Sequence, residues 1–224
     1  EVNVNAATEY IREFVKYLRF PVKVNGVVIS LNDLSGAVPR SAQVWKTSGT
    51  QVSFGAGVSG DYELEVAGTG EVRIDISNVS LDGTSIAGRA ILRENAGSIM
   101  TYRNAFGLAT AAIASRYSFG GVADFLFFKP TAGREALTTD SVATLQRILR
   151  PLDEFVSVAL ATRPESNQSN NFVAWVHGHR RFELCGFMRV RVEPGDSETL
   201  QDLKVRSVAR PLLVYAGNDQ SIIG

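Results

Sequence analysis

Apolar side chains recur at helical spacing near the start of the chain, between residues 6 and 18, and charged residues fall largely on the other side. A period near 3.6 residues predicts an amphipathic helix. The recurring apolar residues are Tyr10, Phe14, Tyr17 and Leu18. Two short apolar runs then flank Asn25 and Gly26, and this dipeptide predicts a two-residue β-hairpin.

Further along, the apolar pattern changes to a period of two residues. Residues 62–68 and 71–81 alternate in this way around a Gly-Thr-Gly turn, which predicts two antiparallel strands with solvent-facing Glu63 and Glu65. Residues 88–93 and 100–109 are also expected to be extended. Residues 30–60 are rich in Gly and Ser, and the short runs QVW and QVSFGAG within them indicate either strands or a loop. The Gly-rich stretch 55–60 lacks the P-loop pattern and is predicted to be a flexible loop.

A helical period returns between residues 138 and 162, with Thr138 or Thr139 as the expected N-cap and Pro151 as the point where the helix restarts. The polar stretch 163–171 is predicted to be a linker. A short helix near 170–177, a helix starting at Asp196 and Ser197, and a final strand over 211–217 should follow.

These elements define the expected fold class, an α+β (α/β) sandwich. Residues 1–163 should form a larger helix–sheet–helix unit with a mainly antiparallel sheet. Residues 164–224 should form a linker and a small α/β unit.

Composition narrows the classes of function. The chain has 224 residues, with 23 Lys+Arg and 23 Asp+Glu, so its formal charge is zero and nucleic acid is an unlikely partner. Cys185 is the single cysteine, which excludes an internal disulfide and favours a cytoplasmic protein. No apolar run approaches the roughly 20 residues of a transmembrane helix, so no membrane partner is expected.

Side chains that could carry chemistry are sparse. His177, His179 and Cys185 could be three metal ligands, but no fourth ligand is obvious, so no metal site is expected. Neither a G-x-S-x-G elbow nor an evident Ser-His-Asp set occurs. We therefore expect the chain by itself to be inactive as an enzyme.

Arg134 is the main candidate for a functional residue. It follows the apolar run 125–128 and precedes the helix predicted from residue 138. Arginine grips phosphate through two N–H groups, and a loop at the start of a helix can present it to an anion. The alternative is a structural role, in which Arg134 pairs with the adjacent Glu135 or with a helix terminus.

The stretch FLFFKPTAGREAL, residues 125–137, resembles the catalytic loop in the middle domain of the ninety-kilodalton heat-shock chaperones, which belong to the GHKL ATPase superfamily. Other segments are similar in the same order: IREFVKYLRFPVKV at 11–24, VADF at 122–125, and the segment 199–217 that ends in PLLVYAG. The resemblance spans nearly the whole chain. The short region 163–187 indicates a divergent, bacterial-type relative.

The resemblance implies a division of labour with domains outside this chain. ATP, with Mg, would be bound mainly by a separate N-terminal domain, and Arg134 would reach its γ-phosphate. Thr131 and Thr138 stand where the family has Asn and Gln, and both can still donate a hydrogen bond. The whole protein would be a homodimeric chaperone of the stress response, and Trp45 and Phe54 would contact client proteins.

Two alternatives remain open. The related transducer domains of topoisomerase and mismatch-repair ATPases use a lysine at the nucleotide, and Lys129 lies close to that place. The chain could instead be a non-catalytic protein-interaction module in which Arg134 has a structural role.

Overall fold

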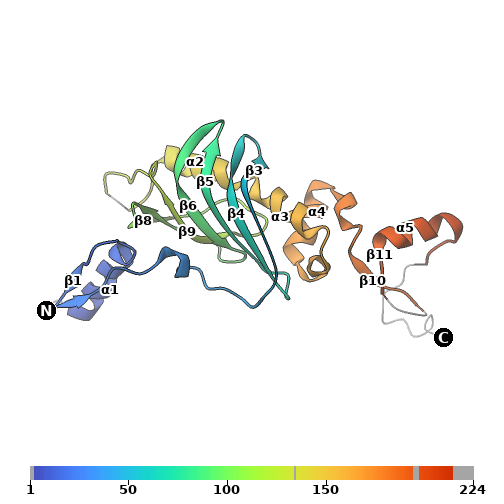
Figure 1. The fold of residues 1–224 in the computed structure, drawn as a ribbon, viewed down its shortest axis with the longest axis horizontal. Coiled ribbons are helices and arrows are strands. Elements are labelled where there is room, and N and C mark those ends of the chain that lie inside the picture. The colour runs from blue at the N-terminus through green and yellow to red at the C-terminus, as the bar shows by residue number, and fades with distance from the viewer. Residues whose placement is uncertain (1–2, 134, 194–196, 214–224) are drawn as a thin grey trace. The chain divides into compact units, whose positions relative to one another are not determined.

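The computed structural model describes residues 3–133, 135–193 and 197–213, drawn in colour in Figure 1. The chain divides into two compact units, residues 1–155 and 156–224. The division falls inside helix α3 (Leu152–Leu160), whereas the sequence suggested a boundary at 163. The fold is α+β, as predicted, with a large, mostly antiparallel sheet, helices, and two small separate sheets.

The large sheet belongs to the first unit and has seven strands. They are β3 (Gln43–Gly55), β4 (Val58–Ala67), β5 (Val72–Leu81), β6 (Thr84–Arg93), β7 (Ile99–Arg103), β8 (Phe106–Ala111) and β9 (Gly120–Phe125). Their order in space is β3-β4-β5-β6-β9-β7-β8, and every neighbouring pair is antiparallel except β7 with β9. The strands predicted from the alternating pattern are confirmed.

One prediction was wrong for the Gly-rich region. Residues 43–55 form one long edge strand, and the supposed flexible loop 55–60 consists of two strand ends joined by a tight turn. Ala56 and Gly57 occupy this turn with positive φ angles of 51° and 77°. Short Ser, Gly and Thr side chains replace apolar ones along this strand, so the sequence lacks the alternation that identifies a strand.

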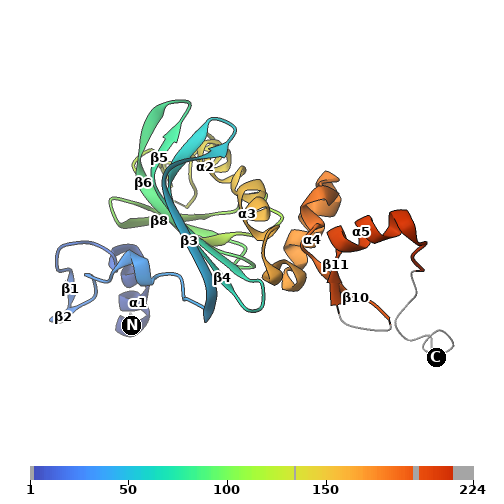
Figure 2. The same cartoon turned by 45° about the vertical axis from the view of Figure 1, so that its right-hand side comes forward.

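One face of the sheet is apolar and packs toward α2 (Thr139–Leu149), which runs alongside the strands in Figures 1 and 2. The fully buried residues include Leu64, Ile74, Ile76 and Leu92 from the sheet and Leu145, Ile148 and Leu149 from α2. Burying each such side chain contributes about 1.5–3 kcal/mol. Thr138 is the N-cap of α2 and the helix restarts after Pro151, so both predictions are confirmed.

The N-terminal segment begins with α1 (Val4–Val15), which Asn3 caps. The predicted hairpin is present as β1 (Lys23–Val24) and β2 (Val27–Val28), with Asn25 and Gly26 in its turn. Val15, Leu18 and Ile29 form a small core of their own. Helix α1 also approaches edge strand β8 so closely that a side chain at Gly107 would meet the backbone of Phe14 at 2.8 Å.

The segment that follows crosses the other face of the sheet. It contains a short 3-10 helix, η1 (Leu34–Gly36), and the buried Val38. Val38 packs with Ile91, Tyr102 and Val122, so this segment covers the β6, β9 and β7 part of that face. The rest of the face, on β3, β4 and β5, carries polar and charged side chains.

The second unit contains α4 (Asn170–His179), α5 (Leu200–Ala209), and the antiparallel pair β10 (Arg189–Arg191) and β11 (Ser197–Thr199). Two 3-10 helices, η2 (Pro164–Gln168) and η3 (Phe182–Cys185), flank α4. The polar stretch 163–171 is therefore ordered as η2 and the start of α4, rather than a plain linker.

The end of the chain differs from the prediction in two places. Ser197 begins β11, and the helix starts three residues later under a Thr199 N-cap, while Asp196 lies outside the described residues. Ser197 belongs to the strand and not to the helix, because it pairs with Arg191 and completes the β10–β11 ladder. Residues 211–213 carry no strand, and residues 214–217 lie outside the described residues.

Candidate functional site

The loop between β9 and α2, residues 129–138, is held closed at its base. Pro130 and Leu137 form an isolated antiparallel bridge. The amide of Thr138 donates to the carbonyl of Lys129 at 2.9 Å, and the amide of Thr131 donates to the carbonyl of Ala136 at 2.8 Å. The loop is therefore a short hairpin whose two ends are tied together immediately before the helix.

Ser141, in the first turn of α2, connects this hairpin to the helix. Its side chain is 3% exposed, and its hydroxyl accepts the amide of Lys129 at 2.9 Å. The same hydroxyl lies 3.0 Å from that of Thr138 and 3.4 Å from the carbonyl oxygen of Phe127. Sequence reasoning missed Ser141, although a serine three residues after an N-cap threonine is a signal that could have drawn attention to it.

The three residues carried over from the family resemblance have different positions. Thr131 is exposed, and its hydroxyl donates to the carbonyl of Ala136 at 3.2 Å. Thr138 is half-buried and accepts the amide of Ser141 at 3.4 Å as the helix cap. Arg134 lies outside the described residues. In the sequence, it falls between the two hydrogen-bonded ends of the hairpin.

Lys129 stands at the base of the same hairpin with an exposed side chain. Its backbone is engaged on both sides, through the amide to Ser141 and the carbonyl to Thr138. Its ammonium group forms no hydrogen bond or ion pair with any residue in the described ranges. Because the backbone of Lys129 is held in place and its ammonium group is unpaired within the described ranges, this side chain can contact an anion on another domain.

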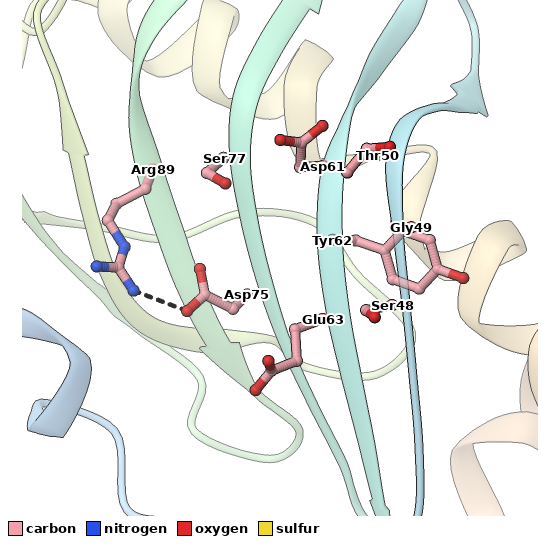
Figure 3. Close-up of a pocket in the computed structure, with 9 residues that line it drawn as sticks. All are labelled: Ser48, Gly49, Thr50, Asp61, Tyr62, Glu63, Asp75, Ser77 and Arg89. Atoms are coloured by element: carbon pink, nitrogen blue, oxygen red, sulfur yellow. Dashed lines mark hydrogen bonds and ion pairs between the residues drawn. The ribbon is translucent and has the colours of Figure 1, made fainter.

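A second polar region lies on the open part of the sheet, on β3, β4, β5 and β6. Figure 3 shows a shallow depression of about 450 Å³ there. Its lining residues are Ser48, Gly49, Thr50, Asp61, Tyr62, Glu63, Asp75, Ser77 and Arg89.

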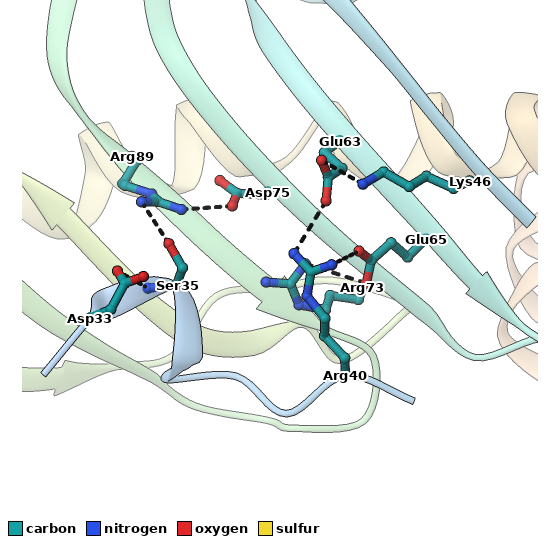
Figure 4. A network of polar contacts seen from close by, with 9 residues as sticks. All are labelled: Asp33, Ser35, Arg40, Lys46, Glu63, Glu65, Arg73, Asp75 and Arg89. Atoms are coloured by element: carbon teal, nitrogen blue, oxygen red, sulfur yellow. Dashed lines mark hydrogen bonds and ion pairs between the residues drawn. The ribbon is translucent and has the colours of Figure 1, made fainter. Parts of the chain in front are cut away.

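The charges on this polar face are paired with one another, as Figure 4 shows. Three contacts measure 2.8 Å each: Arg89 with Asp75, Lys46 with Glu63, and Arg40 with Glu65. Asp61 accepts the amide of Gln51 at 2.8 Å and the side chain of Asn78 at 2.7 Å instead of pairing with a cation. The polar face is thus largely self-neutralised.

Glu65 corrects the expectation that the strand carboxylates face solvent. The alternation itself holds, since Leu64 and Val66 are fully buried on the other face. Glu65, however, is only 4% exposed and pairs at 3.4 Å with the equally buried Arg73. The chain around Arg40 crosses this part of the sheet and covers the pair, a tertiary contact that strand periodicity cannot reveal.

Asp61 and Glu63, two of the carboxylates that line the depression, are poor candidates for a general acid. The hydrogen bond from Asn78 is the largest cause that lowers the pKa of Asp61, and the hydrogen bond from Lys46 is the largest cause that lowers the pKa of Glu63. Both groups therefore stay ionised near neutral pH, where a general acid needs a raised pKa. We assign the depression a structural character.

Metal ligation finds no support in the parts of the chain that the structure describes, where no group of three His, Cys, Asp or Glu side chains comes together. His179 instead stacks on Trp175 at 4.5 Å, and its Nδ1 lies 2.9 Å from the Trp175 carbonyl oxygen. Across the same described ranges, no helix is both long and apolar enough to span a bilayer.

The expected client contacts change as well. Phe54 is only 4% exposed and packs edge-on against Tyr62 and Phe155, with a ring separation of 5.0 Å to the latter. The prediction that Phe54 contacts clients was therefore wrong, because Phe54 lies on a strand and is buried against the rings of Tyr62 and Phe155. Trp45 is half-buried on the same strand.

Comparison with protein-family models gives no match to this chain, and comparison with curated proteins gives none either.

Proposed function

We propose that this chain is the middle segment of a chaperone-like GHKL ATPase and that its 129–138 hairpin completes an active site on another domain. ATP, with Mg, would be bound by a separate N-terminal domain of the same protein. Arg134 would contact the γ-phosphate. The observation that carries the proposal is the closed hairpin base, in which Lys129, Thr138 and Ser141 bind one another at the start of α2.

The physical argument concerns preorganisation. Stabilising a developing charge is most effective when the donor is already in place and needs little reorganisation. Hydrogen bonds at two levels and the buried serine hold the base of the hairpin, at Lys129, Thr131 and Thr138, in place. An arginine there would act as a charge-stabilising finger in phosphoryl transfer.

The remaining parts of the proposal follow from the family resemblance. The whole protein would be a cytoplasmic homodimer that binds client proteins, and this segment would be inactive without its ATP-binding domain. Thr131 and Thr138 would border the nucleotide. Their hydroxyls already take part in hydrogen bonds within the hairpin, which makes them supports for the loop more than direct phosphate ligands.

The test is single-turnover ATP hydrolysis by the full-length protein, comparing wild type with Arg134→Ala. Loss of one such donor should lower the rate by about 10²-fold or more, with little change in ATP affinity. Arg150→Ala is the matched control, because Arg150 is an exposed arginine at the other end of α2. A rate equal to wild type in Arg134→Ala would refute the proposal.

Lys129 supports a second candidate, a transducer domain of the topoisomerase and mismatch-repair type. Its ammonium group is exposed and free of ion pairs within the described ranges, at the base of the same hairpin. In that case Lys129→Ala, and not Arg134→Ala, would abolish hydrolysis. If neither substitution changes the rate, the chain is an interaction module without a catalytic role.

A further inference from the structure

A cavity of about 400 Å³ lies in the first unit, where the N-terminal segment meets one end of the large sheet. Its lining residues are Leu18, Arg19, Phe20, Ala87, Gly88, Asn104, Ala105, Asp124 and Leu126. They come from the segment after α1, the middle of β6, the turn between β7 and β8, and the end of β9. Cavities that hold small ligands begin at about 300 Å³, so this one is large enough.

Asp124 is the acidic group of the cavity. One carboxylate oxygen accepts the amide of Ala105 at 2.9 Å. Burial is the largest cause that raises the pKa of this carboxyl, against backbone hydrogen bonds and the charges of Arg19 and Arg89, which lower it. The carboxylate is half-buried and lines the cavity, so part of it stays accessible to a molecule bound there.

The turn that Asp124 supports is strained. Asn104 and Ala105 both have positive φ angles, 52° and 64°. Asparagine tolerates this conformation, but alanine does so at a cost, and such strain often marks ligand sites. A purely structural role for Asp124 would account for the conformation of the turn. It would not account for the cavity or for the basic residue on the cavity wall.

Arg19 is that basic residue. Its side chain is exposed and close enough to Asp124 for its charge to act on the carboxylate. Within the described ranges it makes no hydrogen bond or ion pair. The cavity therefore offers one anionic group, which is partly accessible, and one cationic group, which is exposed.

The rest of the wall is apolar and accessible. Phe20 is 59% exposed and Leu126 is 44% exposed, although both are large hydrophobic residues. Single exposed hydrophobic residues are normal on a protein surface. Here two of them line the same cavity beside the pair of opposite charges.

We propose that this cavity binds a free α-amino acid with an apolar side chain. Its ammonium group would bind the Asp124 carboxylate and its carboxylate would bind Arg19. Its side chain would pack against Phe20 and Leu126. The assignment is independent of the ATPase proposal, because it uses none of the residues of the 129–138 hairpin.

The test is isothermal titration calorimetry of the 224-residue chain with L-phenylalanine and L-leucine. Saturable binding is expected for both. N-acetyl-phenylalanine lacks the ammonium group and phenylalanine amide lacks the carboxylate, so each should bind roughly tenfold or more weakly. Equal binding of either blocked compound would overturn the proposal in favour of a peptide end, and the absence of saturable binding would overturn it entirely.

Two variants locate the site. Arg19→Gln should weaken L-phenylalanine binding by roughly tenfold or more without affecting folding, because Arg19 makes no ion pair with a described residue. Asp124→Asn should do the same, although it could also loosen the turn at Ala105. Arg12→Gln, on the neighbouring helix α1, is the control and should bind normally. Unchanged affinity in Arg19→Gln would contradict the assignment.

Discussion

The polar face of the sheet and the 129–138 hairpin both carry cations, but the cations differ in whether a carboxylate pairs with them. On the polar face Arg40, Lys46 and Arg89 each contact a carboxylate of the same unit. On the hairpin, Lys129 has its backbone fixed and its ammonium group free within the described ranges. The paired cations satisfy carboxylates of their own unit, whereas the ammonium group of Lys129 remains available to an anion from outside the described residues.

The largest expected effect on stability comes from the buried pair. Arg73→Met would leave Glu65 partly uncompensated under the covering segment, so the free energy of unfolding should fall by about 3–5 kcal/mol. Urea denaturation measures this loss. Replacing both residues, Glu65→Leu with Arg73→Met, should recover most of it, since no buried charge then remains. A double variant as unstable as the single one would contradict a role for the ion pair.

Ser141→Ala should have the next largest effect. It leaves the partly buried amide of Lys129 without its acceptor, which costs about 1 kcal/mol. Hydrogen exchange should also speed up at Lys129 and Thr138. Thr144→Ala is the matched control, because Thr144 is a half-buried residue of the same helix whose hydroxyl donates to the Asp140 carbonyl at 2.8 Å rather than to a described residue of the hairpin. Equal exchange rates at Lys129 and Thr138 in both variants would contradict the role of Ser141 in holding the base of the hairpin.

Acid should weaken the polar face. The hydrogen bond from Arg93 is the largest cause that lowers the pKa of Glu71 below 4.5. A carboxyl with a lowered folded pKa stabilises the protein above its unfolded pKa, and this contribution disappears as the pH falls through the folded pKa. Glu71 is half-buried and still in contact with solvent, which screens the pair, so its share is at most about 1 kcal/mol. Glu71→Gln should therefore lose slightly less stability than wild type between pH 7 and pH 3.

The pKa of Asp124 is raised, so it should act in the opposite direction. A carboxyl whose folded pKa lies above its unfolded value disfavours folding as the pH rises from about 3.8. Asp124→Asn should therefore lose less stability than wild type as the pH rises above about 3.8. Urea denaturation at a series of pH values measures this difference. A larger loss in the variant would contradict the burial of this group.

The smallest effect should come from the free lysine. Lys129→Ala should change the free energy of unfolding by less than about 0.5 kcal/mol, as for other surface substitutions. Lys46→Ala, which breaks an exposed pair with Glu63, should cost about 0.2–1 kcal/mol. Paired urea titrations measure both. A Lys129→Ala variant less stable than Lys46→Ala would mean that the hairpin lysine is structural.

The parts of the fold set by local patterns could be predicted from the sequence. The α2 stripe with its Thr138 cap, the restart after Pro151 and the Asn25-Gly26 hairpin depend on residues close together in the chain. Strand β3 could not be predicted with the same certainty, because its Ser, Gly and Thr residues interrupt the alternation of apolar and polar side chains.

The candidate site divides in the same way. The place of the hairpin between an apolar strand and a helix followed from the sequence. Two features could not be predicted from the sequence, because both arise from tertiary contacts. They are the hydrogen bond that ties the hairpin to Ser141 and the burial of Glu65 under the segment around Arg40. The Asp124 cavity joins three separate segments to the N-terminal one, so no local pattern could indicate it.

The most direct test of the contrast between the two regions is hydrogen exchange in the full-length protein with a non-hydrolysable ATP analogue. We predict that amides of residues 129–138 become protected with the analogue but not with ADP, while residues 46–93 on the polar strands stay unchanged. Protection of the polar strands with no change in the hairpin would contradict the account.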